Sequence, residues 1–100
     1  MYSVHMNKIR FEWNQRKALV NKRKHGVSFE EARTVFSDEY AIEFQDPDHS
    51  ENEDRLLMLG LSGRIRLLDV SFCRREGDSV IRLISARKAM REETQDYRRD

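Results

Sequence analysis

Only one cysteine and one proline occur among the 100 residues, and glycine is scarce, with four copies. The lone cysteine, Cys73, excludes an internal disulfide bond and suits a reducing cytoplasm. The sequence also lacks a long apolar run and a secretion leader, which argues against membrane insertion and export. Its three histidines are scattered, and no close Cys/His pair has the spacing of metal ligands. We therefore expect a cytoplasmic protein that needs neither a metal nor a cofactor.

The net charge of +1 conceals a strong segregation of charge along the chain. Residues 1–36 carry eight Lys/Arg against three Asp/Glu, and residues 37–57 carry eight acids against Arg55 alone. Residues 58–100 are again basic. Fourteen of the nineteen basic residues are arginine, whose planar fork matches phosphate and carboxylate. This bias favours recognition of anions, although genomic base composition can produce the same bias.

Local signals predict two helices early in the chain. Asn14 is a good N-cap for a polar helix over residues 15–25, and Gly26 stands where a helix ends in the left-handed conformation. Ser28 and Glu31 have the spacing of a capping box, which opens a second helix. The apolar residues of this second helix are expected on its inward face: Phe29, Ala32, Val35 and Phe36.

Alternating apolar residues predict a sheet and a final helix. The expected strands cover residues 9–13, 40–45, 55–61, 65–72 and 79–87, and the helix covers residues 88–99, with Met90 and Tyr97 packed inward. Residues 1–6 are expected to be loosely ordered, residues 46–54 to form a polar loop, and Ser62-Gly63 to form a tight hairpin. One hundred residues suit a single domain, residues 1–100. The order β-α-α-β-β-β-β-α predicts an α+β fold on a mainly antiparallel, meandering sheet, with the helices packed on it.

An arginine, Arg82, stands in the middle of the strand predicted at residues 79–87. Because arginine cannot lose its charge, Arg82 must meet a carboxylate, reach the rim of the sheet, or line a site for an anion. An ion pair with Asp69, an unusual residue within a strand, is one structural explanation. Unbroken alternation would place Arg82 and Arg87 on opposite faces, so that both could not point into one groove.

The segment from Lys24 to Ala32, which reads KHGVSFEEA, is the most distinctive in the chain. Other segments accompany it at matching intervals: Phe11-Glu12-Trp13, Val35-Phe36, Asp48-His49-Ser50-Glu51, Glu53-Asp54-Arg55 and Ile84-Ser85-Ala86-Arg87. Over residues 9–97 the chain closely resembles the BrnT toxin family. It departs from the family pattern at Asp69, where an apolar residue is expected, and in the short Ser62-Gly63 hairpin.

The resemblance implies a RelE-like fold and the toxin half of a bacterial type II toxin–antitoxin pair. Such a toxin is a ribonuclease that halts translation and growth, and a BrnA-type antitoxin neutralises it. The implied partners are therefore RNA as substrate and the antitoxin, with operator DNA contacted only through the toxin–antitoxin complex. A dimer is one state that the toxin can take in such a complex. RelE-like enzymes often work with arginine, lysine, tyrosine, histidine or glutamate and have no fixed triad.

Cleavage of RNA without a metal requires a base for the 2′-hydroxyl, an acid for the leaving oxygen, and cations for the charge on the phosphorane. Six residues of suitable type are candidates: Arg82, His25, Arg64, Glu53, Arg87 and Tyr97. Arg82 is the first choice, because a mid-strand arginine needs an explanation.

The other candidates also have purely structural interpretations. His25 lies in the last turn of a predicted helix, where a partly positive imidazole complements the helix dipole. Glu53 can pair with Arg55 or solvate a turn. Arg64 lies near a hairpin and is easily exposed, and a tyrosine at the position of Tyr97 more often belongs to a core.

Two classes of function stay open from the sequence. The first is the endoribonuclease toxin. The second is a module that is weakly catalytic or non-catalytic and acts mainly as antitoxin partner and co-repressor in a DNA-bound complex. A net charge near zero argues against tight nucleic-acid binding by this chain alone, unless its arginines converge on one surface.

Overall fold

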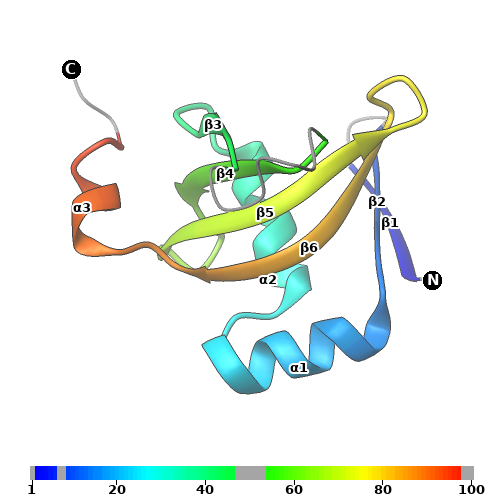
Figure 1. Ribbon diagram of the computed structural model, residues 1–100, viewed down its shortest axis with the longest axis horizontal. Helices are drawn as coiled ribbons and strands as arrows, with labels where there is room; N and C mark the ends of the chain where they lie inside the picture. Colours follow the sequence, from blue (N-terminus) through cyan, green and yellow to red (C-terminus); the bar gives the residue numbers. More distant parts are fainter. Residues whose placement is uncertain (1, 7–8, 47–53, 98–100) are drawn as a thin grey trace.

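The computed structural model describes residues 2–6, 9–46 and 54–97, which form a six-stranded sheet with helices around it (Figure 1). The strands are β1 (Tyr2–Met6), β2 (Ile9–Trp13), β3 (Ile42–Gln45), β4 (Leu56–Leu61), β5 (Leu67–Arg75) and β6 (Val80–Lys88). The helices are α1 (Gln15–His25), α2 (Phe29–Thr34) and α3 (Arg91–Thr94), and the 3-10 turn η1 (Val35–Ser37) follows α2 directly. This confirms the predicted α+β class. No helix in the described ranges is long and apolar enough to cross a membrane.

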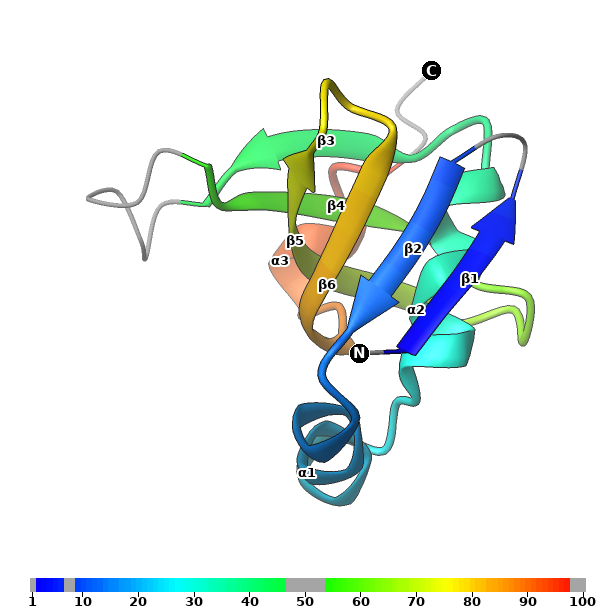
Figure 2. The same ribbon diagram turned by 90° about the vertical axis from the view of Figure 1, so that its right-hand side faces the viewer.

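The strands lie in the order β1-β2-β6-β5-β4-β3. From β3 to β6 the chain forms an antiparallel meander, as predicted. Strand β2 joins this meander by pairing in parallel with β6, beside which it lies in Figure 2. Residues 2–6, part of the segment expected to be loosely ordered, form β1, which pairs antiparallel with β2. This pairing satisfies backbone groups that β2 would otherwise present at an open edge.

The hydrophobic core lies between one face of the sheet and α2 with η1. Phe29, Ala32 and Val35 are buried there as predicted, and Phe36 is partly buried against them. Three aromatic pairs of the described residues meet edge to face there: the ring centroids are 5.9 Å apart for Trp13 and Phe29, 5.3 Å for Phe11 and Phe36, and 4.9 Å for Phe36 and Phe72. The remaining core side chains come from β2, β4, β5, β6 and the approach to α2: Phe11, Val27, Met58, Leu68, Val70, Ile81, Leu83 and Ala86. The opposite face of the sheet, called the outer face below, carries the polar residues of β5 and β6.

A buried asparagine attaches α1 to the sheet. The side-chain amide of Asn21 donates to the carbonyl oxygen of Ala86 at 2.8 Å, and its oxygen accepts from the Ala86 N–H at 3.0 Å. The same amide donates to the carbonyl of Val27 at 2.9 Å. These bonds occupy backbone groups of β6 beyond the point where the paired residues of β2 end at Glu12. As a result α1 runs alongside β6 (Figure 1).

A β-bulge in β6 changes the expected faces of its side chains. Phe72 pairs with Leu83 and Ser71 pairs with Ser85, so Ile84 is the extra residue. Because of this insertion the alternation that would separate Arg82 from Arg87 is broken. Both arginines lie opposite outer-face positions of β5, and the expectation of opposite faces is wrong.

The predicted last helix is also wrong over much of its length. Strand β6 continues to Lys88, and the Ala89 N–H donates to the carbonyl of Leu67, so the ladder extends past the expected helix start. Helix α3 is a single turn that begins after Met90, whose side chain is 52% exposed rather than packed. The backbone N–H of Met90 instead donates to the carboxylate of Glu93 at 2.6 Å.

The hairpin predicted at Ser62-Gly63 is present, but its turn is longer than expected. The Ser62 N–H donates to the carbonyl of Arg66 at 2.8 Å, and the turn includes Ile65 with φ of +60°. Strand β5 therefore begins at Leu67 rather than Ile65. The predicted strand from Tyr40 begins two residues later, at Ile42.

The predicted helix caps are confirmed, with one change. Asn14 accepts a hydrogen bond from the Lys17 N–H and caps α1, which ends at Gly26 with φ of +72°. Ser28 accepts from the Glu31 N–H at 3.0 Å and caps α2. The carboxylate of Glu31 does not complete a capping box. It accepts bonds from the side chains of two residues of the β4–β5 hairpin, Ser62 and Arg66.

The cap of α2 gives a prediction about stability. Ser28→Ala should lower the free energy of unfolding by about 1 kcal/mol, because the Glu31 N–H loses its acceptor. Ser28→Thr keeps a hydroxyl oxygen at the same position and is the matched control. Urea denaturation of the three proteins measures the difference. An alanine variant as stable as the wild type would show that Ser28 does not act as a cap.

Candidate functional site

Four cationic side chains surround a hollow of about 300 Å³ on the outer face, where β5 ends and β6 begins. We call it the basic hollow. Its lining residues are Lys17, Asp54, Arg55, Cys73, Arg75, Arg82 and Ile84. Among the residues that the structure describes, Lys17, Arg55 and Arg75 form no ion pair with a carboxylate. The hollow therefore carries an excess of positive charge that suits an anion.

The antiparallel meander brings these cations together from distant parts of the sequence. The start of β4, the end of β5 and the start of β6 meet at one end of the sheet, and Cys73 lies directly opposite Arg82. Helix α1 adds Lys17 from its first turn. Because a helix N-terminus carries partial positive charge, its position here adds to the attraction for an anion.

Arg82 is oriented by a carboxylate of the neighbouring strand. Its Nη1 lies 3.4 Å from an Oε2 of Glu12, which faces it across the parallel pair of β2 and β6. Glu12 also binds Arg10 at 3.2 Å, so it does not neutralise Arg82 alone. The Arg82 side chain is 31% exposed and reaches the basic hollow. Of the explanations foreseen for this arginine, an ion pair with Asp69 is wrong, since Asp69 lies opposite Arg87.

A second hollow, of about 310 Å³, continues from the first along α1 and shares Lys17 and Ile84 with it. Its other lining residues are Arg16, Val20, Asn21, Lys24, His25 and Ser85. The structure thus places two of the predicted site residues, Arg82 and His25, along one continuous basic groove between α1 and the outer face. In the groove the imidazole of His25 is therefore combined with fixed cations.

The other predicted site residues lie away from this groove or outside the described ranges. Arg64 is in the β4–β5 turn with its side chain 72% exposed, and the nearest oxygen of Glu31 is 3.9 Å away. The hydroxyl of Tyr97 donates to the carboxylate of Asp38. Glu53 lies outside the residues that the structure describes.

Arg87 lies further along the outer face and holds two acids together. Its guanidinium donates to Asp69 at 2.8 Å and to both oxygens of Glu93 at 3.0 Å. This contact accounts for the aspartate that the sequence places unexpectedly within a strand. Burial and the neighbouring Glu93 carboxylate raise the pKa of Asp69 to about 7, and the charge of Arg87 offsets this only in part.

Three cations of the basic hollow were missed by the sequence reasoning: Lys17, Arg55 and Arg75. The only sequence feature that pointed to Arg55 and Arg75 was their position. Arg75 and Arg82 flank the turn between β5 and β6, and Arg55 directly precedes β4, which pairs with β5. Ordinary surface arginines give the same signal, so only the pairing of the strands distinguishes them. In the described part of the chain, no group of three or more His, Cys, Asp or Glu side chains could hold a metal ion.

A model of the family described as "Ribonuclease toxin, BrnT, of type II toxin-antitoxin system" matches residues 13–93. Among solved structures, the chain is similar to the crystal structure of the Brucella abortus ribonuclease toxin BrnT, with a TM-score of 0.62 and 24% sequence identity. That alignment covers 81% of this chain and 96% of the Brucella chain. At this identity the structural likeness supports the fold alone. No curated protein sequence gives a significant match.

The raised pKa of Asp69 predicts how stability depends on pH. The folded protein holds this proton up to about pH 7, whereas the unfolded chain releases it near 3.8. Stability should therefore fall as the pH rises from about 5 to about 8, by on the order of 1 kcal/mol or more. Asp69→Asn imitates the protonated side chain and should remove this loss.

Thermal melts at both pH values measure the effect, and the difference between wild type and variant isolates Asp69 from the histidines. Asp96→Asn, which changes an exposed acid nearby, is the matched control and should retain the loss. Equal pH dependence in wild type and Asp69→Asn would contradict the assignment of the proton.

Proposed function

The chain belongs to the BrnT family of ribonuclease toxins of type II toxin–antitoxin systems, and on that basis we propose that it is a metal-independent endoribonuclease. In this proposal the toxin has a RelE-like fold and cleaves RNA in the cytoplasm, so that translation and growth stop. A BrnA-type antitoxin neutralises it, and operator DNA is bound only by the complex of the two proteins. Metal independence rests on the scattered histidines and the lack of a Cys/His pair in the sequence.

The observation that carries the proposal is the convergence of cations in the basic groove. Within it, the four cations of the basic hollow face a single carboxylate of the lining, Asp54. RNA presents one phosphate per nucleotide, and binding it depends on concentrated cations of this kind. A chain of nearly zero net charge can bind RNA tightly only if its cations gather on one surface, and this convergence supplies such a surface.

We assign Arg82 to the scissile phosphate. A guanidinium can bind two phosphate oxygens at once, and Glu12 fixes its orientation before the substrate arrives. Lys17 and Arg75 add positive charge where the phosphorane would form. His25 lines the same groove and is the candidate for proton transfer to or from the ribose oxygens. Because it lies eight residues beyond Lys17, roughly 12 Å along α1, this role requires the reacting ribose to extend along the groove toward the end of the helix. Arg64, Arg87 and Tyr97 have structural contacts elsewhere, and we give them no part in the reaction.

The alternative is an interaction module that serves the antitoxin and has little or no catalytic activity. In that case the cations of the basic hollow bind the phosphate backbone of a nucleic acid, and the protein does not cleave it. The two proposals differ in whether the purified chain cuts RNA.

If the first proposal holds, purified protein should cleave single-stranded RNA equally well with and without EDTA. The products should end in a 2′,3′-cyclic phosphate or a 3′-phosphate, because the neighbouring 2′-hydroxyl is the nucleophile. Gel analysis of end-labelled RNA, with and without phosphatase treatment, identifies these ends. Loss of cleavage in EDTA, restored by a divalent ion, would overturn the mechanism, and an intact RNA would favour the interaction module.

Arg82 gives the sharpest mutational prediction. Arg82→Ala should slow RNA cleavage on the order of a hundredfold or more, through loss of charge stabilisation in the transition state. Arg82→Lys should recover only part of the rate, because a point charge replaces a bidentate fork. Stability should change by only about 0–1 kcal/mol, since Glu12 keeps its contact with Arg10.

Arg64→Ala is the matched control, because it removes an exposed arginine outside the groove and should leave cleavage unchanged. Single-turnover cleavage rates, together with thermal melts, separate a catalytic defect from a folding defect. An Arg82→Ala protein that cuts RNA at the wild-type rate would remove Arg82 from the site.

A further inference from the structure

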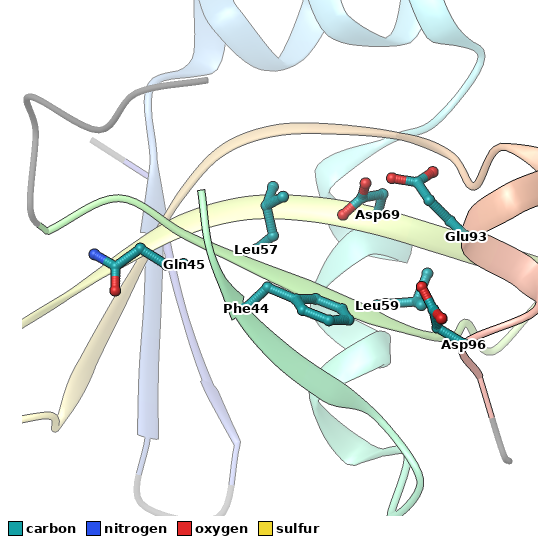
Figure 3. A pocket seen from close by; sticks show the side chains of 7 residues that line it. All are labelled: Phe44, Gln45, Leu57, Leu59, Asp69, Glu93 and Asp96. Atoms are coloured by element: carbon teal, nitrogen blue, oxygen red, sulfur yellow. The ribbon is translucent and has the colours of Figure 1, made fainter. Parts of the chain in front are cut away.

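A third hollow, of about 220 Å³, lies on the outer face among β3, β4, β5 and α3 (Figure 3). We call it the acidic hollow. It is lined by Phe44, Gln45, Leu57, Leu59, Asp69, Glu93 and Asp96. Its apolar part is continuous, because Phe44 lies opposite Leu57 on the paired strands β3 and β4. Phe44 is 36% exposed, a large aromatic surface left open to solvent.

The polar rim of this hollow is negative. Asp69 and Glu93 share one guanidinium, that of Arg87, and the two carboxylates lie side by side in Figure 3. Asp96 adds a third carboxylate, which has no ion pair within the described residues. Even with Asp69 protonated, the carboxylates of Glu93 and Asp96 outnumber the one guanidinium, so the rim is negative. A negative rim above an apolar floor suits a ligand that combines positive charge with apolar surface.

The neighbouring edge of the sheet can hold an extended segment. Strand β3 is the last strand on its side of the described sheet, so its outer backbone groups have no neighbouring strand there. Such an edge accepts an added strand from a partner, with main-chain hydrogen bonds for affinity and side-chain pockets for specificity. Residues 37–46, which include β3, carry four acids and no lysine or arginine, so a segment added here should be basic.

We propose that the acidic hollow and the β3 edge form the docking site of the antitoxin, which binds there through an extended segment that is both basic and apolar. A lysine or arginine of this segment meets the carboxylates of Glu93 and Asp96, and an apolar side chain covers Phe44. The inference rests on the antitoxin partnership in the proposed function, but not on RNA cleavage.

The position of this site suggests how binding can block the groove. Asp69 and Cys73 lie on the same strand, on the same face, and line the acidic and the basic hollow respectively. Four residues of extended strand correspond to roughly 13 Å. A protein bound at the acidic hollow is therefore close enough to the proposed RNA site to obstruct it sterically, without occupying the basic hollow itself.

The test uses two variants of the full chain, each with a matched control. Asp96→Lys reverses an exposed charge on the rim, and its control, Glu92→Lys, makes the same kind of change on an exposed residue of α3 outside the hollow. Phe44→Ser removes the open apolar surface, and its control, Ile65→Ser, removes an exposed apolar residue in the β4–β5 turn. Calorimetry with the purified antitoxin encoded beside the toxin measures affinity, and melts confirm that each variant is folded.

We expect each hollow variant to weaken antitoxin binding about tenfold or more, and both controls to bind like wild type. RNA cleavage by the free variants should be unchanged, while the antitoxin inhibits them less well. Wild-type affinity in Asp96→Lys and Phe44→Ser, equal loss in the controls, or no binding to the wild type would each overturn the docking site. A wild-type chain that binds the antitoxin through this hollow but cuts no RNA would refute the ribonuclease proposal and leave this inference standing.

Discussion

The arrangement of the outer face depends on one buried side chain, Asn21. Its amide bonds both backbone groups of Ala86 on β6 and also the carbonyl of Val27, where the chain turns toward α2. In effect a side chain replaces a stretch of neighbouring strand, because the paired residues of β2 end at Glu12. Without it, three buried backbone groups would lack partners, and each such group costs about 1–3 kcal/mol. The same bonds hold α1 beside β6, so the placement of Lys17 and His25 follows from them.

The second constraint is the bulge at Ile84. The extra residue keeps Leu83 and Ala86 on the core face although they are an odd number of positions apart. It also brings Arg82 and Arg87 onto the outer face together. The two arginines nevertheless meet different surroundings: Arg82 faces a hollow rich in cations, whereas Arg87 is held between Asp69 and Glu93. One face of the sheet thus has a basic end, to which we assign RNA, and an acidic end, to which we assign the antitoxin.

Much of the fold could be predicted, but the candidate site could be predicted only in part. The capped helices and the meander from β3 to β6 follow from short-range patterns, and Arg82 stood out because a charge within a strand needs a partner. The partner itself was misjudged. Asp69 had seemed the natural choice, but the register places Arg82 opposite Cys73, four residues from Asp69, and beyond the bulge Asp69 lies opposite Arg87. The length of the last helix was overestimated because strand pairing prevailed over local preference. The local sequence at Lys88 and Ala89 favours a helix, but these residues continue the β5–β6 ladder beside Leu68 and Leu67.

The sequence by itself determined the helix caps, the inward residues of the second helix, the unusual position of Asp69 within a strand, and the family. The caps, the inward residues and Asp69 are recognised from residues within a few positions of each other. The family is recognised from motifs along the whole chain, and this does not require knowing which residues are in contact. Only the tertiary structure decided that Glu12 orients Arg82, that Arg87 donates a hydrogen bond to Asp69, and that Lys17, Arg55 and Arg75 meet at one hollow. Each of these contacts joins separate elements, and its existence depends on strand order, register and the angle of α1, which no local sequence pattern encodes.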